Sequence, residues 1–210
     1  ETFYGRMEGP LNEQLSMESP EKAWLAEYRR GSVEAMGKLV EHYRRPLFGF
    51  ILRMTEGRED AEEIFQEAWF RVIRNLDSYR EKRFLSWLFR IAHNLVIDRA
   101  RKARPGVDPR PGEPGQQDGI EAQLPAPGIS PARQVDGRDL GERISTAVGR
   151  LPPEQKEVFL MRMEGDLPFK EIAKIQGTSI NTALARMQYA LAKLREELKT
   201  DYRDLSGEQP

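Results

Sequence analysis

The 210-residue sequence contains no cysteine. This absence excludes disulfide bonds, thiolate zinc sites and redox sensing through thiols. Histidine is nearly as scarce, because His42 and His93 are the only two, which is too few for a metal centre built on histidine. We therefore expect no metal and no cofactor.

Long hydrophobic runs are also missing. No apolar run approaches the roughly 18 residues of a membrane-spanning helix, and the first residues lack the basic-then-apolar pattern of a signal peptide. The sequence therefore predicts a soluble, cytoplasmic protein with no direct membrane insertion.

Neither sign of charge dominates, since 33 Lys and Arg residues accompany 34 Asp and Glu residues. The net charge therefore gives no indication of a nucleic-acid partner, but the distribution of charge is uneven. Residues 22–104 carry 18 basic and 12 acidic side chains, and the acidic excess lies elsewhere. Nucleic-acid binding thus stays open for this segment.

Alternating polar and apolar residues are absent over any useful length, so the predicted fold class is all-α. Residues 105–135 hold seven of the 14 prolines and five of the 17 glycines, which indicates a flexible linker between two small helical domains. The predicted organisation is a flexible extension at 1–21, a first domain at 22–104, the linker at 105–135, a second domain at 136–200 and a tail at 201–210.

Apolar residues at three- and four-residue steps predict two long helices in the first domain. Earlier helices are expected at 24–28 and 36–54, with a kink or a boundary at Pro46. The two apolar stripes comprise Ala61, Ile64, Phe65, Ala68, Val72, Ile73 and Leu76, and then Leu85, Leu88, Ile91, Ala92, Leu95 and Val96.

The second domain contains the pattern of a helix-turn-helix. Helices are expected near 140–150, 154–163, 169–176 and 179–199, with Thr178 as the N-cap of the last. A helix-turn-helix indicates DNA binding, although a plain helical hairpin has the same periodicity. The residues expected in the shared core are Ile172, Ile180 and Leu184, with the small Ala173 where the helices cross.

Two stretches of the first domain carry polar groups on one helical face. The first places four acidic or amide side chains opposite an apolar stripe, which is typical of a solvated face; a metal site is a worse interpretation, because no histidine accompanies them. These residues are Asp60, Glu63, Gln66 and Glu67.

The second stretch, 84–102, is aromatic and apolar at its start and basic at its end. Trp87, Ile91 and Leu95 are most simply core residues, and His93 is an ordinary helix residue. The basic end is either a phosphate-facing patch or a solvated face. Its residues are Arg99, Arg101, Lys102 and Arg104.

Taken in order, these motifs resemble those of the extracytoplasmic-function sigma factors of RNA polymerase. The residues 60–67, 84–94 and 98–99 are similar to the family's second region. The segments 151–154 and 171–173, with the final helix, are similar to its fourth region, and the linker replaces the third. The resemblance implies a region 2 helical bundle and a region 4 helix-turn-helix, without a catalytic residue.

The resemblance also implies partners and contact residues. The acidic face would bind the clamp helices of the polymerase β′ subunit, region 4 would reach the β flap, and an anti-sigma factor would hold the protein inactive. Contacts with the −10 element of promoter DNA would involve Asp77, Ser78, Tyr79, Arg80, Lys82, Arg83, Phe84, Asn94, Asp98, Arg99, Arg101 and Lys102. Contacts with the −35 element would involve Thr178, Ser179, Asn181, Thr182, Ala185, Arg186, Gln188 and Tyr189.

One departure concerns the recognition helix, where Leu184 stands at a position that is usually arginine in the family. Arginine is the best bidentate reader of guanine, so we expect weak or altered −35 recognition. Two alternatives remain open: an autonomous dimeric helix-turn-helix regulator, and a sigma-like protein that has lost promoter binding. The acidic face has no role in the first, and the arginine-poor helix favours the second.

Overall fold

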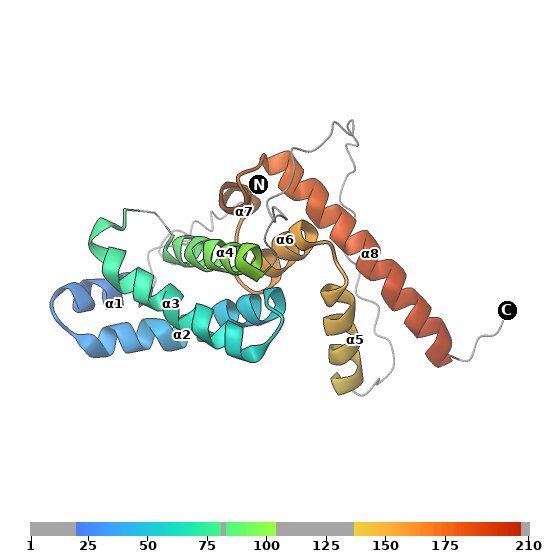
Figure 1. Ribbon diagram of the computed structural model, residues 1–210, viewed down its shortest axis with the longest axis horizontal. Helices are drawn as coiled ribbons and strands as arrows, with labels where there is room; N and C mark the ends of the chain where they lie inside the picture. Colours follow the sequence, from blue (N-terminus) through green and yellow to red (C-terminus); the bar gives the residue numbers. More distant parts are fainter. Residues whose placement is uncertain (1–19, 81–82, 104–136, 207–210) are drawn as a thin grey trace, which may run out of the picture. The chain divides into compact units, whose positions relative to one another are not determined.

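The computed structural model describes residues 20–80, 83–103 and 137–206, and within these ranges it contains helices and no strand (Figure 1). The predicted all-α class is confirmed. The predicted linker at 105–135 lies outside the described residues, as does Lys82.

Two compact units divide at Arg44 and Arg45. In the first unit, α1 (Pro20–Arg29) is followed by the beginning of α2 (Val33–Met54). The hydroxyl group of Tyr43 donates a hydrogen bond to the carboxylate of Glu21, which ties the two helices together. Because the division falls inside α2, the domain boundaries expected from the sequence stay predictions.

Helix α2 continues through Pro46, so the boundary expected there is wrong. A proline inside a helix costs about 3 kcal/mol through its missing N–H group and its steric clash. The following turns bury Leu47, Phe50 and Ile51 completely, and each such side chain contributes about 1.5–3 kcal/mol. Burial of the helix therefore outweighs the local cost of the proline.

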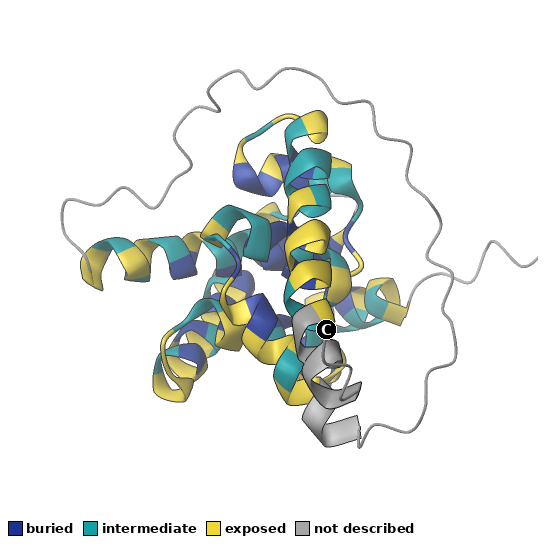
Figure 2. Ribbon diagram, turned by 90° about the vertical axis from the view of Figure 1, so that its right-hand side faces the viewer, coloured by how far each residue is buried: buried dark blue, intermediate teal, exposed yellow. Residues whose placement is uncertain are grey.

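The second unit begins with the end of α2 and continues with α3 (Arg58–Asn75), a short 3₁₀ turn (Leu76–Ser78) and α4 (Phe84–Ala103). Helix α3 packs against α4. The stripe predicted on α3 is buried except for two members: Phe65 is half-buried and Ile73 is exposed. Trp69 is buried, so the apolar face of α3 lies slightly further round the helix than expected (Figure 2).

Four helices follow in the same unit: α5 (Gly137–Gly149), α6 (Pro153–Met163), α7 (Phe169–Gln176) and α8 (Ile180–Ser206). Helix α8 packs on each of the other three. Gly177 ends α7 in the left-handed conformation with φ of 65°, a conformation that favours glycine. The backbone N–H of Thr178 donates to the carbonyl of Ala173 at 2.9 Å, which closes the turn of a helix-turn-helix.

Two details of this motif differ from the prediction. The side chain of Ser179, and not that of Thr178, caps α8 by accepting the backbone N–H of Thr182 at 3.0 Å. Ile180 is 44% exposed, and Ala183 occupies the shared core in its place. The cap falls one residue later than expected, because a side chain caps the N–H three residues ahead and the helix begins at Ile180.

Candidate nucleic-acid and protein interfaces

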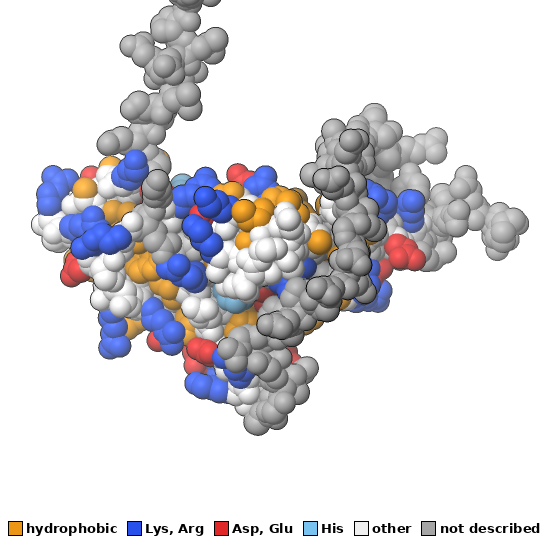
Figure 3. All heavy atoms as spheres, turned by 90° about the horizontal axis from the view of Figure 1, so that it is seen from above, with side chains coloured by type: hydrophobic (Ala, Val, Ile, Leu, Met, Phe, Trp, Pro, Cys, Tyr) orange, Lys and Arg blue, Asp and Glu red, His pale blue; other side chains and the backbone are white. Residues whose placement is uncertain are grey.

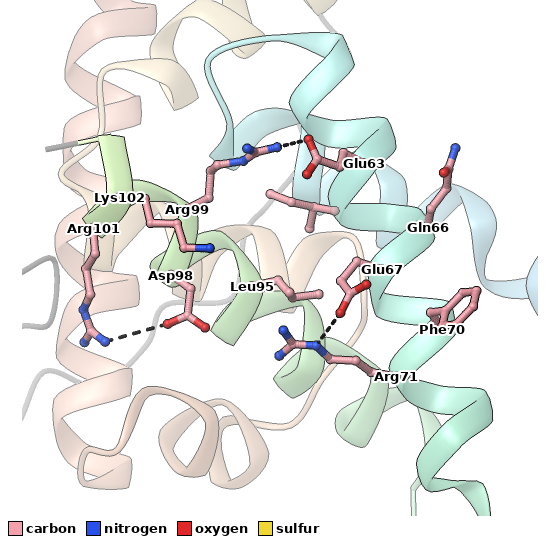
Figure 4. A pocket seen from close by; sticks show the side chains of 11 residues that line it. Glu63, Gln66, Glu67, Phe70, Arg71, Leu95, Asp98, Arg99, Arg101 and Lys102 are labelled. Carbon is pink, nitrogen blue, oxygen red and sulfur yellow. Dashed lines mark hydrogen bonds and ion pairs between the residues drawn. The ribbon is translucent and has the colours of Figure 1, made fainter.

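The polar residues of α3 form one accessible surface. The buried Ala61, Ile64 and Ala68 face inward, and the four polar residues predicted between them lie on the opposite side, as the helical spacing requires. The structure therefore brings Asp60, Glu63, Gln66 and Glu67 together on this surface, which we call the α3 face (Figure 4).

The carboxylates of the α3 face are paired with arginines. The Arg99 guanidinium on α4 donates a hydrogen bond to Glu63 and lies 3.0 Å from Asp60. The Glu63 hydrogen bond raises the pKa of Arg99, despite an opposing effect of desolvation, and the charge of Asp60 adds to the rise. On α3 itself, Arg71 donates to Glu67 at 2.9 Å. The α3 face is therefore a mixed surface of ion pairs.

An aromatic side chain extends this surface. Phe70 is 59% exposed and lines the groove between α3 and α4 with Gln66 and Glu67. The Arg74 guanidinium lies over its ring, 5.2 Å from the ring centre. Sequence reasoning missed Phe70, although a phenylalanine outside the apolar stripe is a visible signal. An exposed aromatic residue beside paired charges is typical of a protein-binding surface.

The loop between α3 and α4 is supported by aromatic packing. The Tyr79 ring lies 4.9 Å from the Trp87 ring and 5.7 Å from the Phe84 ring. Phe84 is only 1% exposed, so it belongs to this cluster and does not form part of the surface. Arg80 donates to the carbonyl groups of Asp77 and Tyr79, which shapes the turn. Asp77, Ser78, Arg80 and Arg83 are exposed.

The polar residues of α4 lie beyond this loop. Asn94, Asp98 and Lys102 are exposed at four-residue intervals and therefore share a face. The guanidinium of Arg101 lies 3.8 Å from Asp98. Lys and Arg side chains (blue) are prominent on the face of the molecule that Figure 3 shows. The predicted residues on α4 thus form one mixed, largely basic strip.

His93 on α4 is not the ordinary surface position that its sequence context indicated. Its Nε2 atom lies 3.3 Å from the Glu157 carboxylate of α6, and Glu157 is only 4% exposed. Glu157 also accepts a hydrogen bond from Gln176 at 2.7 Å. The two partners are 64 residues apart in the chain, and no local pattern relates them.

The recognition helix α8 exposes a polar end. Asn181 and Tyr189 are exposed, and Arg186 donates to the Gln176 side chain at 2.9 Å. Leu184 is half-buried. The remaining predicted contact residues are half-buried, apart from the exposed Ser179, and comprise Thr178, Thr182, Ala185 and Gln188. One arginine on this surface is thus held by a neighbouring side chain.

Metal chemistry and membrane crossing were also considered. In the part of the chain that the structure describes, no group of three or more His, Asp or Glu side chains is arranged to hold a metal ion. Within the same ranges, no helix has both the length and the apolar character needed to cross a bilayer.

Comparisons with known proteins agree with this arrangement. Residues 39–105 match the family model of sigma-70 region 2, and residues 141–194 match that of sigma-70 region 4. The ECF RNA polymerase sigma factor SigW of Bacillus subtilis is 29% identical over 188 residues, which cover 87% of this chain and 99% of SigW.

Two solved structures share the fold. CnrH in complex with the cytosolic domain of CnrY has a TM-score of 0.60 at 21% identity, covering 87% of this chain and 99% of CnrH. Sigma factor RpoE in complex with the anti-sigma factor NepR from Bartonella quintana has a TM-score of 0.58 at 20% identity, with coverage of 80% and 99%.

Proposed function

Because the chain belongs to the extracytoplasmic-function family of RNA polymerase sigma factors, we propose that it binds core polymerase, directs it to promoters and helps to melt the −10 region. The observation that carries this proposal is the occurrence, in order, of a region 2 match and a region 4 helix-turn-helix in one chain. An autonomous helix-turn-helix regulator would leave the first match without a role.

The α3 face is the proposed contact with the β′ clamp helices. Its carboxylates are accessible and sit on a rigid helix whose opposite side is buried. Phe70 adds an apolar anchor next to Gln66 and Glu67, and desolvated aromatic anchors carry much of the energy in protein interfaces. Arg99 and Arg71 hold the carboxylates in place until polymerase cations compete for them.

The proposed −10 surface combines the loop after α3 with the polar strip of α4. Exposed loop groups would receive an unstacked base, and the Tyr79–Trp87 stack supports the loop from below. Asn94 and Asp98 would form hydrogen bonds, while Arg99, Arg101 and Lys102 would neutralise phosphates. Because unstacking one base costs only a few kcal/mol, such contacts suffice to stabilise melted DNA without any catalytic residue.

The proposed −35 surface is the beginning of α8. Ser179 fixes the first turn, and its neighbours Asn181 and Tyr189 are exposed toward a DNA partner. Amide and hydroxyl groups read base edges or phosphates less strongly than a bidentate arginine does. Region 4 therefore contributes modest sequence discrimination, with the β flap as its polymerase partner.

Regulation by an anti-sigma factor is the remaining part of the proposal. RpoE, which shares the fold, was solved bound to such a factor. An inhibitor that covers the α3 face or the recognition helix would block both steps of initiation. We place the protein in the cytoplasm, where bacterial RNA polymerase acts, and we propose that it has no enzymatic activity of its own.

Run-off transcription tests the proposed function. Purified core polymerase is incubated with the full chain and fragmented genomic DNA, and transcripts are mapped. Discrete start sites that depend on the added chain are expected. Co-purification with core polymerase but no transcripts would identify a protein that has lost promoter binding, while DNA binding without polymerase would identify an autonomous regulator.

A further inference from the structure

One side of α4 contacts the helix-turn-helix of the same chain. All of the residues involved lie in the second compact unit, and α4 packs against α7. Two separate contacts, one polar and one steric, join these elements.

The polar contact is a buried hydrogen-bonded chain. His93 of α4 lies 3.3 Å from Glu157 of α6, and Glu157 accepts the Gln176 amide of α7 at 2.7 Å. The same amide donates to the carbonyl of Glu154 at 3.1 Å, and its oxygen accepts Arg186 of α8 at 2.9 Å. Since a buried carboxylate is costly without partners, this chain holds α4 and the recognition helix in one arrangement.

The steric contact lies one turn earlier on α4. A Cβ atom at Gly165 would lie 2.8 Å from the Phe89 ring, so only glycine permits this approach. The neighbouring Glu164 pairs with Arg53 at the end of α2. The backbone after α6 is therefore seated directly on the side of α4 that carries Phe89 and His93.

This seating covers part of the proposed −10 surface. The end of α7, with Lys174 and Gln176, lines the same cleft as Asn94 and Asp98. A single DNA strand that reaches Asn94 would need the space in front of these residues. The recognition helix is affected as well, because its Arg186 is bonded to Gln176.

We propose that the α4 side formed by Phe89, His93 and Asn94 is a docking surface for the chain's own helix-turn-helix, and that docking and −10 binding exclude each other. The inference rests on the proposed function for the role of Asn94. The free protein is closed by region 4 in cis, and promoter capture requires that region 4 leaves α4.

The docking itself is tested without DNA. The chain has no cysteine, so Ile97→Cys introduces the only thiol, at the edge of the cleft. Its rate of maleimide labelling should rise about tenfold when Gly165→Ala is added, the change expected from losing roughly one net hydrogen bond. Gly149→Ala, where a Cβ meets nothing within 4 Å, is the matched control and should change nothing.

A folding defect in Gly165→Ala would itself expose the thiol, so circular dichroism and thermal melting accompany each variant. Arg53→Ala, an exposed change that removes the Glu164 pair, should raise the labelling rate in the same direction with the fold intact. Equal labelling rates in the parent, Gly165→Ala and Arg53→Ala proteins would overturn the docking.

The exclusion is tested by locking the cleft. A cleavable bis-maleimide should join the thiols of Ile97→Cys and Lys174→Cys within one free molecule, and locking should lower affinity for a single-stranded −10 oligonucleotide about tenfold or more. The probe sequence comes from the mapped start sites. Cleavage of the linker should restore binding, and each single-cysteine variant treated alike should bind as the parent does.

The possible outcomes separate the two proposals. Undiminished oligonucleotide binding by the locked protein would overturn the exclusion. Absence of an intramolecular product would overturn the docking. If the unlocked protein directs no transcription by core polymerase, the proposed function fails, whereas the labelling rates still decide whether the helix-turn-helix docks on α4.

Discussion

Arg99 and Asp60 lie 3.0 Å apart, one on the proposed DNA-binding helix and the other on the proposed polymerase-binding helix. Arg99 also pairs with Glu63. One cation is therefore shared by carboxylates that polymerase would bind and by a phosphate that the promoter would supply. Binding of polymerase to the α3 face would release Arg99 toward DNA, which couples the two partners through a single side chain.

The first prediction follows from this sharing. Combining Asp60→Asn with Glu63→Gln should raise the affinity of the polymerase-free protein for a −10 oligonucleotide by about two- to fivefold, since exposed ion pairs are weak. Fluorescence anisotropy at low salt measures the effect, because added salt screens it. Adding Arg99→Ala should remove the gain, and Glu62→Gln, which affects a pair with Arg58, should leave affinity unchanged. A gain that persists without Arg99 would contradict the coupling.

The second prediction concerns the polymerase contact. Replacing Gln66 and Glu67 with arginine should abolish co-purification with core polymerase, because two positive charges replace the amide and carboxylate that meet the clamp helices. Helical content should stay unchanged, since both side chains are exposed. Glu62→Arg on a neighbouring part of α3 is the control for charge. Undiminished binding by the double variant would remove the interface assignment.

The third prediction separates a binding role from a folding role in two phenylalanines. Phe70→Ala should change the free energy of unfolding by less than about 1 kcal/mol, because the ring is largely exposed, and should still weaken polymerase binding. Phe89→Ala should cost about 3–5 kcal/mol, since that ring is fully buried. Urea unfolding followed by circular dichroism checks both values. A large loss of stability in Phe70→Ala would show that the ring serves the fold.

Periodicity predicted most of the helices, because a helix that buries one side repeats its apolar residues at fixed steps. It predicted α7 at 169–176, as observed. Local rules failed where distant packing decides the outcome: α2 tolerates Pro46 because the turns around it are buried, and Ile180 is exposed because the smaller Ala183 faces the crossing.

The exposed groups of the α3 face could likewise be predicted, since exposure opposite an apolar stripe is a local property. Their pairing with Arg99 could not, because it depends on how α3 and α4 cross. The contact between His93 and Glu157 was equally hidden. A glutamate within an apolar helix is the one local signal, and it does not name its partner across the chain.

The fourth prediction concerns where promoter specificity resides. Leu184 is half-buried and cannot replace a base-reading arginine, and Arg186 is bonded to Gln176. Direct readout of the −35 element therefore lacks about 1–3 kcal/mol for each bidentate contact that is absent. The −10 surface, by contrast, keeps an exposed loop, Asn94 and a basic strip.

Changes in the −10 element should consequently reduce transcription more than changes in the −35 element do. The comparison uses run-off transcription from promoters mutated separately in each element, with Asn94→Ala and Asn181→Ala proteins side by side. Asn94→Ala should flatten the response to −10 mutations and leave the response to −35 mutations as in the parent. If −35 mutations reduce activity far more, α8 reads DNA through Asn181, Gln188 or Tyr189 strongly enough to replace arginine, and the lower weight given to region 4 is wrong.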